Sequence, residues 1–199
     1  ELLDPQLMTD NSQKMRFSEM TVALKECPVS EFNSWYIGGI AHEMAHIFGL
    51  PHDYGNKLEL EPSTISLMGQ YGSRHFRDYL WGGEKSAVFS SASIIQLISH
   101  PVFTQSIKDK NRRPLFSISG IEFSNTESEI KINGNFRTDI APYAVVALSH
   151  PVVLNEYFNQ SSFDLVTNND SFSISLGQLS LGDYRLLLTF LFPNGMTFR

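Results

Sequence analysis

Three histidines and one glutamate in the segment "GGIAHEMAHIFGLPHD" (38–53) have the types and spacing of a metal site. His42 and His46 are four residues apart, so on a helix their imidazoles leave the same face one turn apart and can bind one ion. Glu43 follows the first histidine and points roughly 100° around the helix, beside the ion rather than onto it. A carboxylate there can accept a proton from zinc-activated water and later pass it to a leaving amine.

The third ligand must come from outside the helix, because two histidines do not hold zinc well. Gly49 can adopt the left-handed conformation that ends a helix and turns the chain back, which would bring His52 to the ion. Three neutral histidines leave a fourth position open for water, as in catalytic zinc sites. We therefore expect one catalytic zinc ion, bound by His42, His46 and His52.

The extended pattern resembles the zinc motif of the metzincin metalloendopeptidases, with His42-Glu43-x-x-His46-x-x-Gly49-x-x-His52-Asp53 in this chain. The aspartate after the third histidine is most similar to the reprolysin (adamalysin) branch. The stretch "SLMGQYG" (66–72) resembles the Met-turn of the family. The resemblance covers roughly residues 30–107.

This resemblance implies a zinc-dependent metalloendopeptidase that hydrolyses a protein or peptide substrate and is secreted or held in the cell envelope. It implies that Met68 forms the floor beneath the metal and that Asp53 anchors the loop after the third histidine. It also implies that the residues after Met68 wall the pocket for the side chain that follows the scissile bond, namely Gly69, Gln70 and Tyr71.

The sequence departs from the metzincin pattern in three places. Only some 33 residues precede the zinc helix, so we expect the upper subdomain to be short or truncated. The cysteines of the reprolysin branch are absent, since Cys27 is the only cysteine, either a buried thiol or a thiolate that blocks zinc. Gln70 stands where astacins carry a tyrosine ligand, so Tyr71 is not assigned to the metal.

Two helices should position this site. Apolar periodicity predicts the first from Ser34 through Phe48, and the second covers "SASIIQLIS" (91–99), with Ser90 or Ser91 as its cap. Gly38 and Gly39 inside the first helix each cost roughly 1 kcal/mol against alanine, which suggests close approach by another backbone segment.

The pattern changes at "KDKNRRP" (108–114), after which seven short alternating runs predict strands. We therefore expect an α+β chain, with a metzincin-like catalytic domain at 1–113 and an immunoglobulin-like β-sandwich at 114–199. Tyr184, at the head of the strongest run, resembles the tyrosine corner of such sandwiches. The stretch "DLVTNNDS" (164–171) could bind calcium, but a polar turn between strands fits it better.

The amino-acid composition limits the classes of partner that this chain could bind. The net charge of −6 and the absence of a long basic cluster argue against nucleic acid, and no apolar run reaches the length of a transmembrane segment. The sandwich could attach the enzyme to a cell-surface or matrix partner. Two alternatives stay open, namely a catalytically degenerate zinc-binding or adhesion module, and a zinc hydrolase that acts on non-protein amides.

Overall fold

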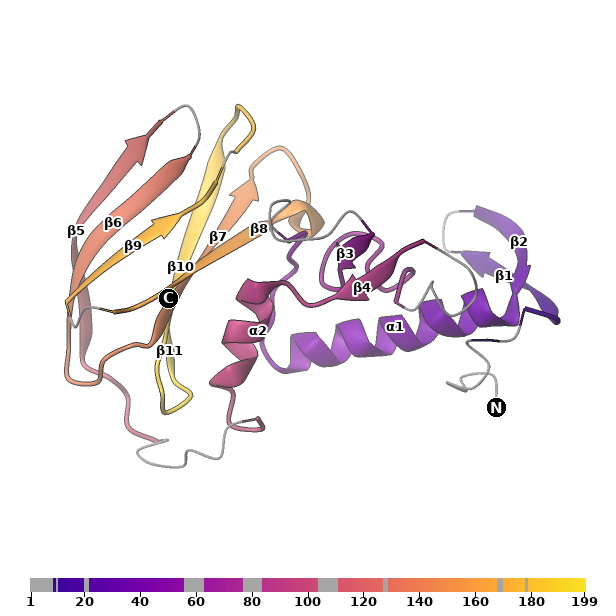
Figure 1. Cartoon of the computed structure of the whole chain (residues 1–199), viewed down its shortest axis with the longest axis horizontal. Coiled ribbons are helices and arrows are strands. Elements are labelled where there is room, and N and C mark those ends of the chain that lie inside the picture. The colour runs from indigo at the N-terminus through magenta and orange to yellow at the C-terminus, as the bar shows by residue number, and fades with distance from the viewer. Residues whose placement is uncertain are drawn as a thin grey trace. The chain divides into compact units, whose positions relative to one another are not determined.

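The computed structural model describes residues 9, 11–19, 22–55, 63–76, 84–103, 111–126, 129–167, 170–177 and 179–199. The chain is an α+β protein, as predicted, and its contacts divide it into two compact units that part between Phe89 and Ser90. Figure 1 shows the helix-centred first unit and the strand-rich second unit. Within the described ranges, no helix has both the length and the hydropathy that crossing a membrane requires.

The first unit is organised around one long helix, α1. Its start is tied to the preceding chain by a hydrogen bond from the Val29 amide to the Gln13 carbonyl, at 3.0 Å. Cys27 and Phe32 form a small apolar cluster there, with Met15 and Trp35 packed against it. The elements are an antiparallel hairpin, the helix and a parallel strand pair: β1 (Lys14–Glu19), β2 (Val22–Pro28), α1 (Val29–Ile47), β3 (Thr64–Ser66) and β4 (Ser86–Val88).

Helix α1 begins at Val29, five residues before the predicted start at Ser34, and ends one residue early, at Ile47. The added turn is buried although three of its five residues are polar, so apolar periodicity did not predict it. Burial is tolerated because the polar groups are paired. The Asn33 side chain, for example, donates to the Val29 carbonyl at 2.9 Å.

Of the two glycines inside α1, only Gly38 meets another segment. A Cβ atom at Gly38 would collide with the Ser73 carbonyl oxygen and the Phe76 side chain, so the predicted close approach is confirmed there. A Cβ atom at Gly39 would meet nothing within 4 Å, so the same prediction was wrong for that residue. Gly38 therefore lets the segment around residues 73–76 lie directly on the helix.

The second unit contains a strand at each of the seven predicted runs. The strands form two antiparallel sheets, of order β11-β10-β7-β8 and β5-β6-β9. A single 3₁₀ turn, η3 (Glu156–Phe158), precedes β8. The strands are β5 (Phe116–Asn125), β6 (Ile130–Thr138), β7 (Ala144–Pro151), β8 (Gln160–Leu165), β9 (Ser171–Ser175), β10 (Tyr184–Leu191) and β11 (Thr197–Phe198).

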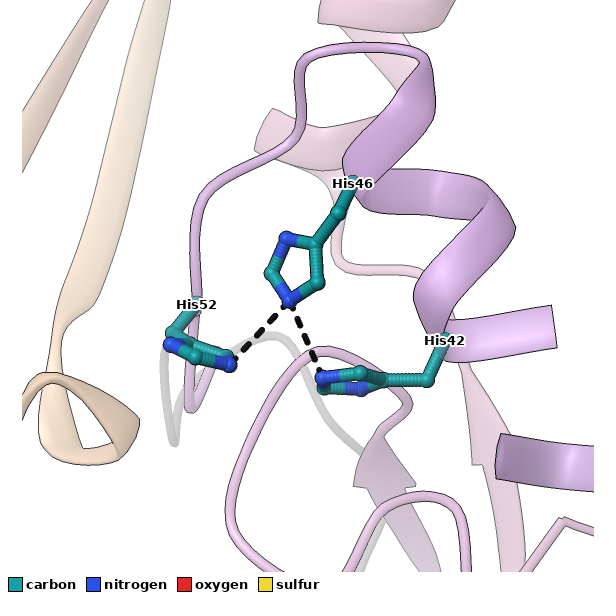
Figure 2. Close-up of side chains that lie close together, drawn as sticks. All are labelled: His42, His46 and His52. Atoms are coloured by element: carbon teal, nitrogen blue, oxygen red, sulfur yellow. Dashed lines mark hydrogen bonds between the residues drawn. The ribbon is translucent and has the colours of Figure 1, made fainter. Parts of the chain in front are cut away.

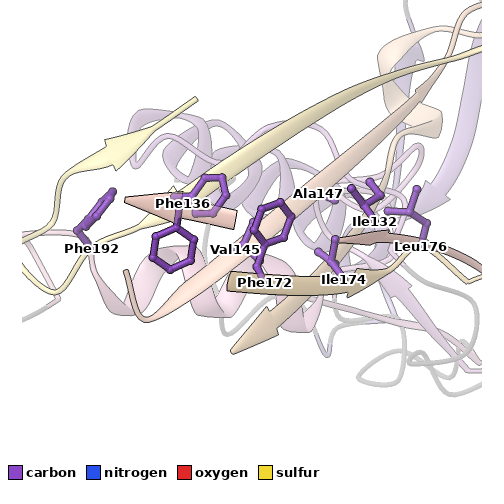
Figure 3. Packing of buried hydrophobic residues seen from close by; sticks show 9 residues of the cluster. Ile132, Phe136, Val145, Ala147, Phe172, Ile174, Leu176 and Phe192 are labelled. Carbon is purple, nitrogen blue, oxygen red and sulfur yellow. The ribbon is translucent and has the colours of Figure 1, made fainter. Parts of the chain in front are cut away.

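One apolar core joins the two sheets. Figure 3 shows side chains of β6, β7 and β9 meeting between them. Phe136 of β6 and Phe190 of β10 are at most 1 % exposed, and their ring centroids lie 5.9 Å apart in an edge-to-face arrangement. Removing one such ring costs about 3–5 kcal/mol, so this core can hold the unit together by itself.

Helix α2 (Ser91–Ile98) belongs to the strand unit, not to the unit that holds α1. Ser90 caps it, because its hydroxyl accepts a hydrogen bond from the Ser93 amide at 3.1 Å. Ala92 is fully buried in a cluster with three sheet residues: Ala144, Val146 and Leu191. The units therefore part before α2 and not at the predicted boundary 113/114, because Ala92 and Ile95 of this helix pack against the sheet.

A fragment of residues 90–199 should be more stable than a fragment of residues 114–199. The shorter fragment loses the packing of Ala92 and the hydrogen bond that the Tyr143 hydroxyl donates to the Ile95 carbonyl at 2.7 Å. The lost hydrogen bond and the exposed apolar patch should together cost at least about 2 kcal/mol. Urea unfolding of both fragments measures the difference, and equal midpoints would contradict the role given to α2.

Candidate metal centre

The last turns of α1 present two histidines on one face. His42 and His46 are one helical turn apart, and His42 is buried whereas His46 is half-buried. Both lie within the 19-residue helix, so their Cα positions are held by the regular backbone hydrogen bonds of the helix. The helix alone therefore places His42 and His46 on one face, as predicted.

The helix ends in a Schellman motif at Gly49. The Gly49 amide donates to the His46 carbonyl at 2.9 Å, and the Leu50 amide donates to the Ala45 carbonyl at 3.1 Å. Gly49 has φ +86°, in the left-handed region that side chains with a Cβ rarely adopt. Since a Cβ there would meet nothing within 4 Å, the glycine is needed for its backbone angle and not for space.

This reversal brings His52 back to the helix. The Nε2 atom of His46 lies 3.1 Å from Nε2 of His42 and 3.1 Å from Nε2 of His52. Figure 2 shows the three rings pointing their Nε2 atoms at one spot. A tetrahedral ion with ligand bonds of about 2.0–2.1 Å holds its nitrogen ligands about 3.3 Å apart, so the observed separations suit one small metal ion.

Backbone carbonyls orient two of the rings. Nδ1 of His42 lies 2.7 Å from the Leu67 carbonyl oxygen, and Nδ1 of His46 lies 2.8 Å from the Leu50 carbonyl oxygen. A carbonyl only accepts, so each Nδ1 carries a proton, and in the neutral form of each ring the lone pair of Nε2 faces the other ring. Two lone pairs at this distance repel, unless a cation lies between them. The three histidines therefore form a site that can bind a metal ion.

The segment 66–72 lies against this centre. The Asp53 amide donates to the Met68 carbonyl at 3.0 Å, and the Met68 side chain is completely buried. The Asp53 carboxylate is 1 % exposed and accepts a hydrogen bond from the Gly55 amide at 2.9 Å. Hydrogen bonds thus hold the loop that carries His52 to Met68 and, through the Asp53 carboxylate, to Gly55.

The remaining predicted site residues differ in exposure. Glu43 is exposed on α1, next to His42 in sequence. After Met68, the chain passes through buried Gly69 and half-buried Gln70 to Tyr71, whose side chain is 60 % exposed. Tyr71 has φ 64°, a strained angle for a residue with a side chain. Such strain is common at functional sites, but it is not by itself proof of one.

Sequence reasoning missed the two carbonyl groups that orient the rings, those of Leu50 and Leu67. No side-chain signal could have identified them, because any residue offers a carbonyl and only the folded backbone places it. Elsewhere in the described ranges, no other histidines, cysteines or acidic residues gather closely enough to hold a metal ion. The other three histidines of the chain, His75, His100 and His150, lie outside the centre.

Three solved structures of OgpA from Akkermansia muciniphila resemble the fold. Catalytically inactive OgpA, in complex with the O-glycopeptide substrate glycodrosocin, has a TM-score of 0.71 and 18% identity over 86% of this chain and 49% of that chain. Two crystal forms of wild-type OgpA have TM-scores of 0.69 and 0.67, each with 21% identity over 86% of this chain. This chain spans about half of their length, 49% and 48% for the two wild-type forms.

The likeness to OgpA concerns the fold, because identities near one in five leave the chemistry of individual residues undetermined. No protein-family model matches the sequence, and no curated protein is significantly similar to it.

Replacing Gly49 by valine should abolish tight metal binding without touching a ligand. A β-branched residue at φ +86° costs roughly 1–3 kcal/mol, and relaxing the turn withdraws His52 from the centre. The matched control is Gly39→Val, on the same helix, where a Cβ meets nothing within 4 Å and the helix needs no left-handed angle. Competition against a chromophoric chelator measures affinity, and equal zinc affinity in both variants would show that this turn does not deliver the third ligand.

Proposed function

We propose that this chain carries the zinc centre of a peptide-hydrolysing enzyme of the metzincin type. The observation that carries the proposal is the convergence of three Nε2 atoms, two of them with lone pairs set by carbonyl groups on the opposite ring nitrogen. Three neutral imidazoles are the ligand set of several catalytic zinc sites, and they leave room for water and substrate. Structural zinc sites instead have four protein ligands.

His42, His46 and His52 would hold the ion, and zinc, when bound, lowers the pKa of a water molecule toward about 7 and polarises a carbonyl group. The carbonyl groups of Leu50 and Leu67 hold two of these ligands through Nδ1 and fix their rings in rotation. A fixed ligand loses little freedom on binding, which raises affinity for the ion. In the metzincin resemblance, buried Met68 is the floor of this site, and the residues that follow it, Gly69, Gln70 and Tyr71, wall the substrate pocket.

Glu43 is the proposed general base. It lies about 100° around α1 from His42, so its carboxylate stands beside the histidine face of the helix and not on it. It is exposed, and therefore reachable by substrate and water. In peptide hydrolysis the carboxylate accepts the proton of the attacking water, and the resulting carboxylic acid gives that proton to the departing amine. Glu43 begins and ends the cycle ionised.

The resemblance to OgpA supports a peptide as substrate. One of its structures holds an O-glycopeptide substrate, and the fold likeness covers 86% of the present chain. Together with the metzincin resemblance, this supports a peptide bond over other amides as the bond that is cleaved. The zinc mechanism and the secreted or envelope location are both proposed on the metzincin resemblance.

The strand unit is proposed to be an immunoglobulin-like sandwich that attaches the enzyme to a cell-surface or matrix partner. In support, the first, second and fifth strands share one sheet (β5, β6 and β9), and the third, sixth and seventh share the other (β7, β10 and β11). That division is the one found in immunoglobulin domains. The fourth strand, β8, pairs with β7 rather than with the first sheet, which differs from the constant-domain arrangement.

Metal analysis tests the centre directly. We expect about one zinc ion per chain after gentle dialysis, because one group of three histidines is present in the described ranges. Replacing His52 with alanine should lower the affinity for zinc by orders of magnitude, because a two-ligand site holds zinc poorly. A native chain that neither contains zinc nor binds it on addition would sink the proposal.

Exchange of Glu43 for glutamine should keep the metal and abolish hydrolysis. Without a carboxylate the water loses its proton acceptor, and turnover should fall at least about 10²-fold. Glu84→Gln is the matched control, since Glu84 is an exposed glutamate of the same unit. Cleavage of casein and of an O-glycopeptide, followed by mass spectrometry, provides the readout. Zinc binding with no cleavage by the unaltered chain would favour the degenerate module instead.

A further inference from the structure

The strand unit contains a polar pocket of about 390 Å³ that the histidine centre does not use. This volume falls within the range of about 300–1,000 Å³ that is usual for small-molecule sites. Seven of its lining residues have polar side chains: Glu122, Asn133, Asn135, Asp164, Thr167, Ser171 and Ser173. The others are Gly120, Gly134, Leu165 and Phe172.

The strand register arranges these side chains in two rows. Glu122 of β5 is opposite Asn133 of β6, which is opposite Ser173 of β9. Two residues along β6, Asn135 is opposite Ser171. Residues in register share one face of a sheet, so the first row spans about 10 Å across the strands and the second lies about 7 Å further along. The pocket thus offers a flat array of amide, hydroxyl and carboxylate groups.

A glycine bulge shapes this array. The pairing of β5 with β6 shifts between Ser119 and Glu122, and Gly120 has φ +61° within the bulge. A Cβ at Gly120 would lie only 3.2 Å from the side-chain nitrogen of Asn135. Bulges re-aim side chains and are frequent beside binding sites. Here the bulge returns Glu122 to the face of Asn133 and leaves the Asn135 amide unobstructed.

The lining selects the kind of ligand. The described residues that line the pocket include no lysine or arginine, and its two carboxylates, Glu122 and Asp164, disfavour phosphate, sulfate and nucleic acid. Within the described residues, neither carboxylate belongs to a group of three histidine, cysteine or acidic side chains close enough to hold one metal ion. Amides and hydroxyls that both donate and accept, beside carboxylates that accept, suit a neutral molecule with many hydroxyl groups. Leu165, 52 % exposed, adds an apolar surface for carbon–hydrogen groups.

We propose that this pocket binds a neutral sugar unit of a glycan. The sugar hydroxyls donate to Glu122 and Asp164 and exchange hydrogen bonds with Asn133, Asn135 and the serines of β9. The inference goes beyond the proposed peptidase and does not depend on the histidine centre. A shallow polar site of this kind should bind a monosaccharide weakly, with Kd of about 1 mM or above, and should gain affinity from a longer glycan.

Titration of the whole, isotope-labelled chain with free N-acetylgalactosamine, followed by NMR, tests the proposal. This sugar contains no substrate peptide bond, so the result is independent of hydrolysis and of zinc. We expect saturable shifts of the amide signals of Asn133, Asn135 and Ser173 by about 50 mM sugar, a concentration well above such a Kd. The O-glycopeptide glycodrosocin should shift the same signals, whereas the same peptide without its glycan should not.

Two serines provide matched variants. Ser173→Phe fills the pocket from an exposed position and should weaken sugar binding at least about tenfold. Ser117→Phe makes the same change at an exposed position of β5 outside the lining and should leave binding unchanged. Unfolding midpoints show whether each variant is folded. If Ser173→Phe does not fold, Glu122→Gln provides a milder second test of sugar binding. Absence of saturable shifts with the sugar, or shifts only with a lysine-rich peptide or with calcium, would overturn the proposal.

Discussion

The first unit depends on one electrostatic constraint, the meeting of imidazole lone pairs at a single point. Nε2 of His46 lies 3.1 Å from Nε2 of both His42 and His52, and two of the rings have their protons held on the far side by carbonyl groups. With the rings neutral, lone pairs at this distance repel, and a cation between them would remove that repulsion. Neighbouring segments of the chain must therefore hold the three histidine side chains close together although their lone pairs repel one another.

Three features of the backbone supply that hold. The Schellman motif at Gly49 reverses the chain, and its Leu50 carbonyl then receives the His46 ring. The Met68 carbonyl fastens Asp53, next to the third ligand. Close approach at Gly38 lets residues 73–76 lie on α1. Each of these positions tolerates little change, because two need an unusual backbone angle or a missing Cβ and the third is completely buried.

The strand unit meets a different requirement. Its stability comes from aromatic and aliphatic side chains between two sheets, so the outer face of β5, β6 and β9 is free to carry polar groups. The same division explains why α2 groups with the strands, since Ala92 is buried against sheet residues. A chain built this way can change the outer face of its strand unit without disturbing the three histidines, because the two are held by separate cores.

Local sequence determined much of this protein. The features that predicted the histidine group and the strands each depend on only a few neighbouring residues. They are the i and i+4 histidines, the helix-ending glycine and the seven alternating runs. Tertiary structure decided the rest. Ser30, Glu31 and Asn33 are helical because their polar side chains find partners when buried, and α2 joins the strand unit because Ala92 packs against the sheet. The carbonyl groups that orient His42 and His46 have no side-chain signature, and residues far apart in the chain met to form the polar pocket only once strand register was set.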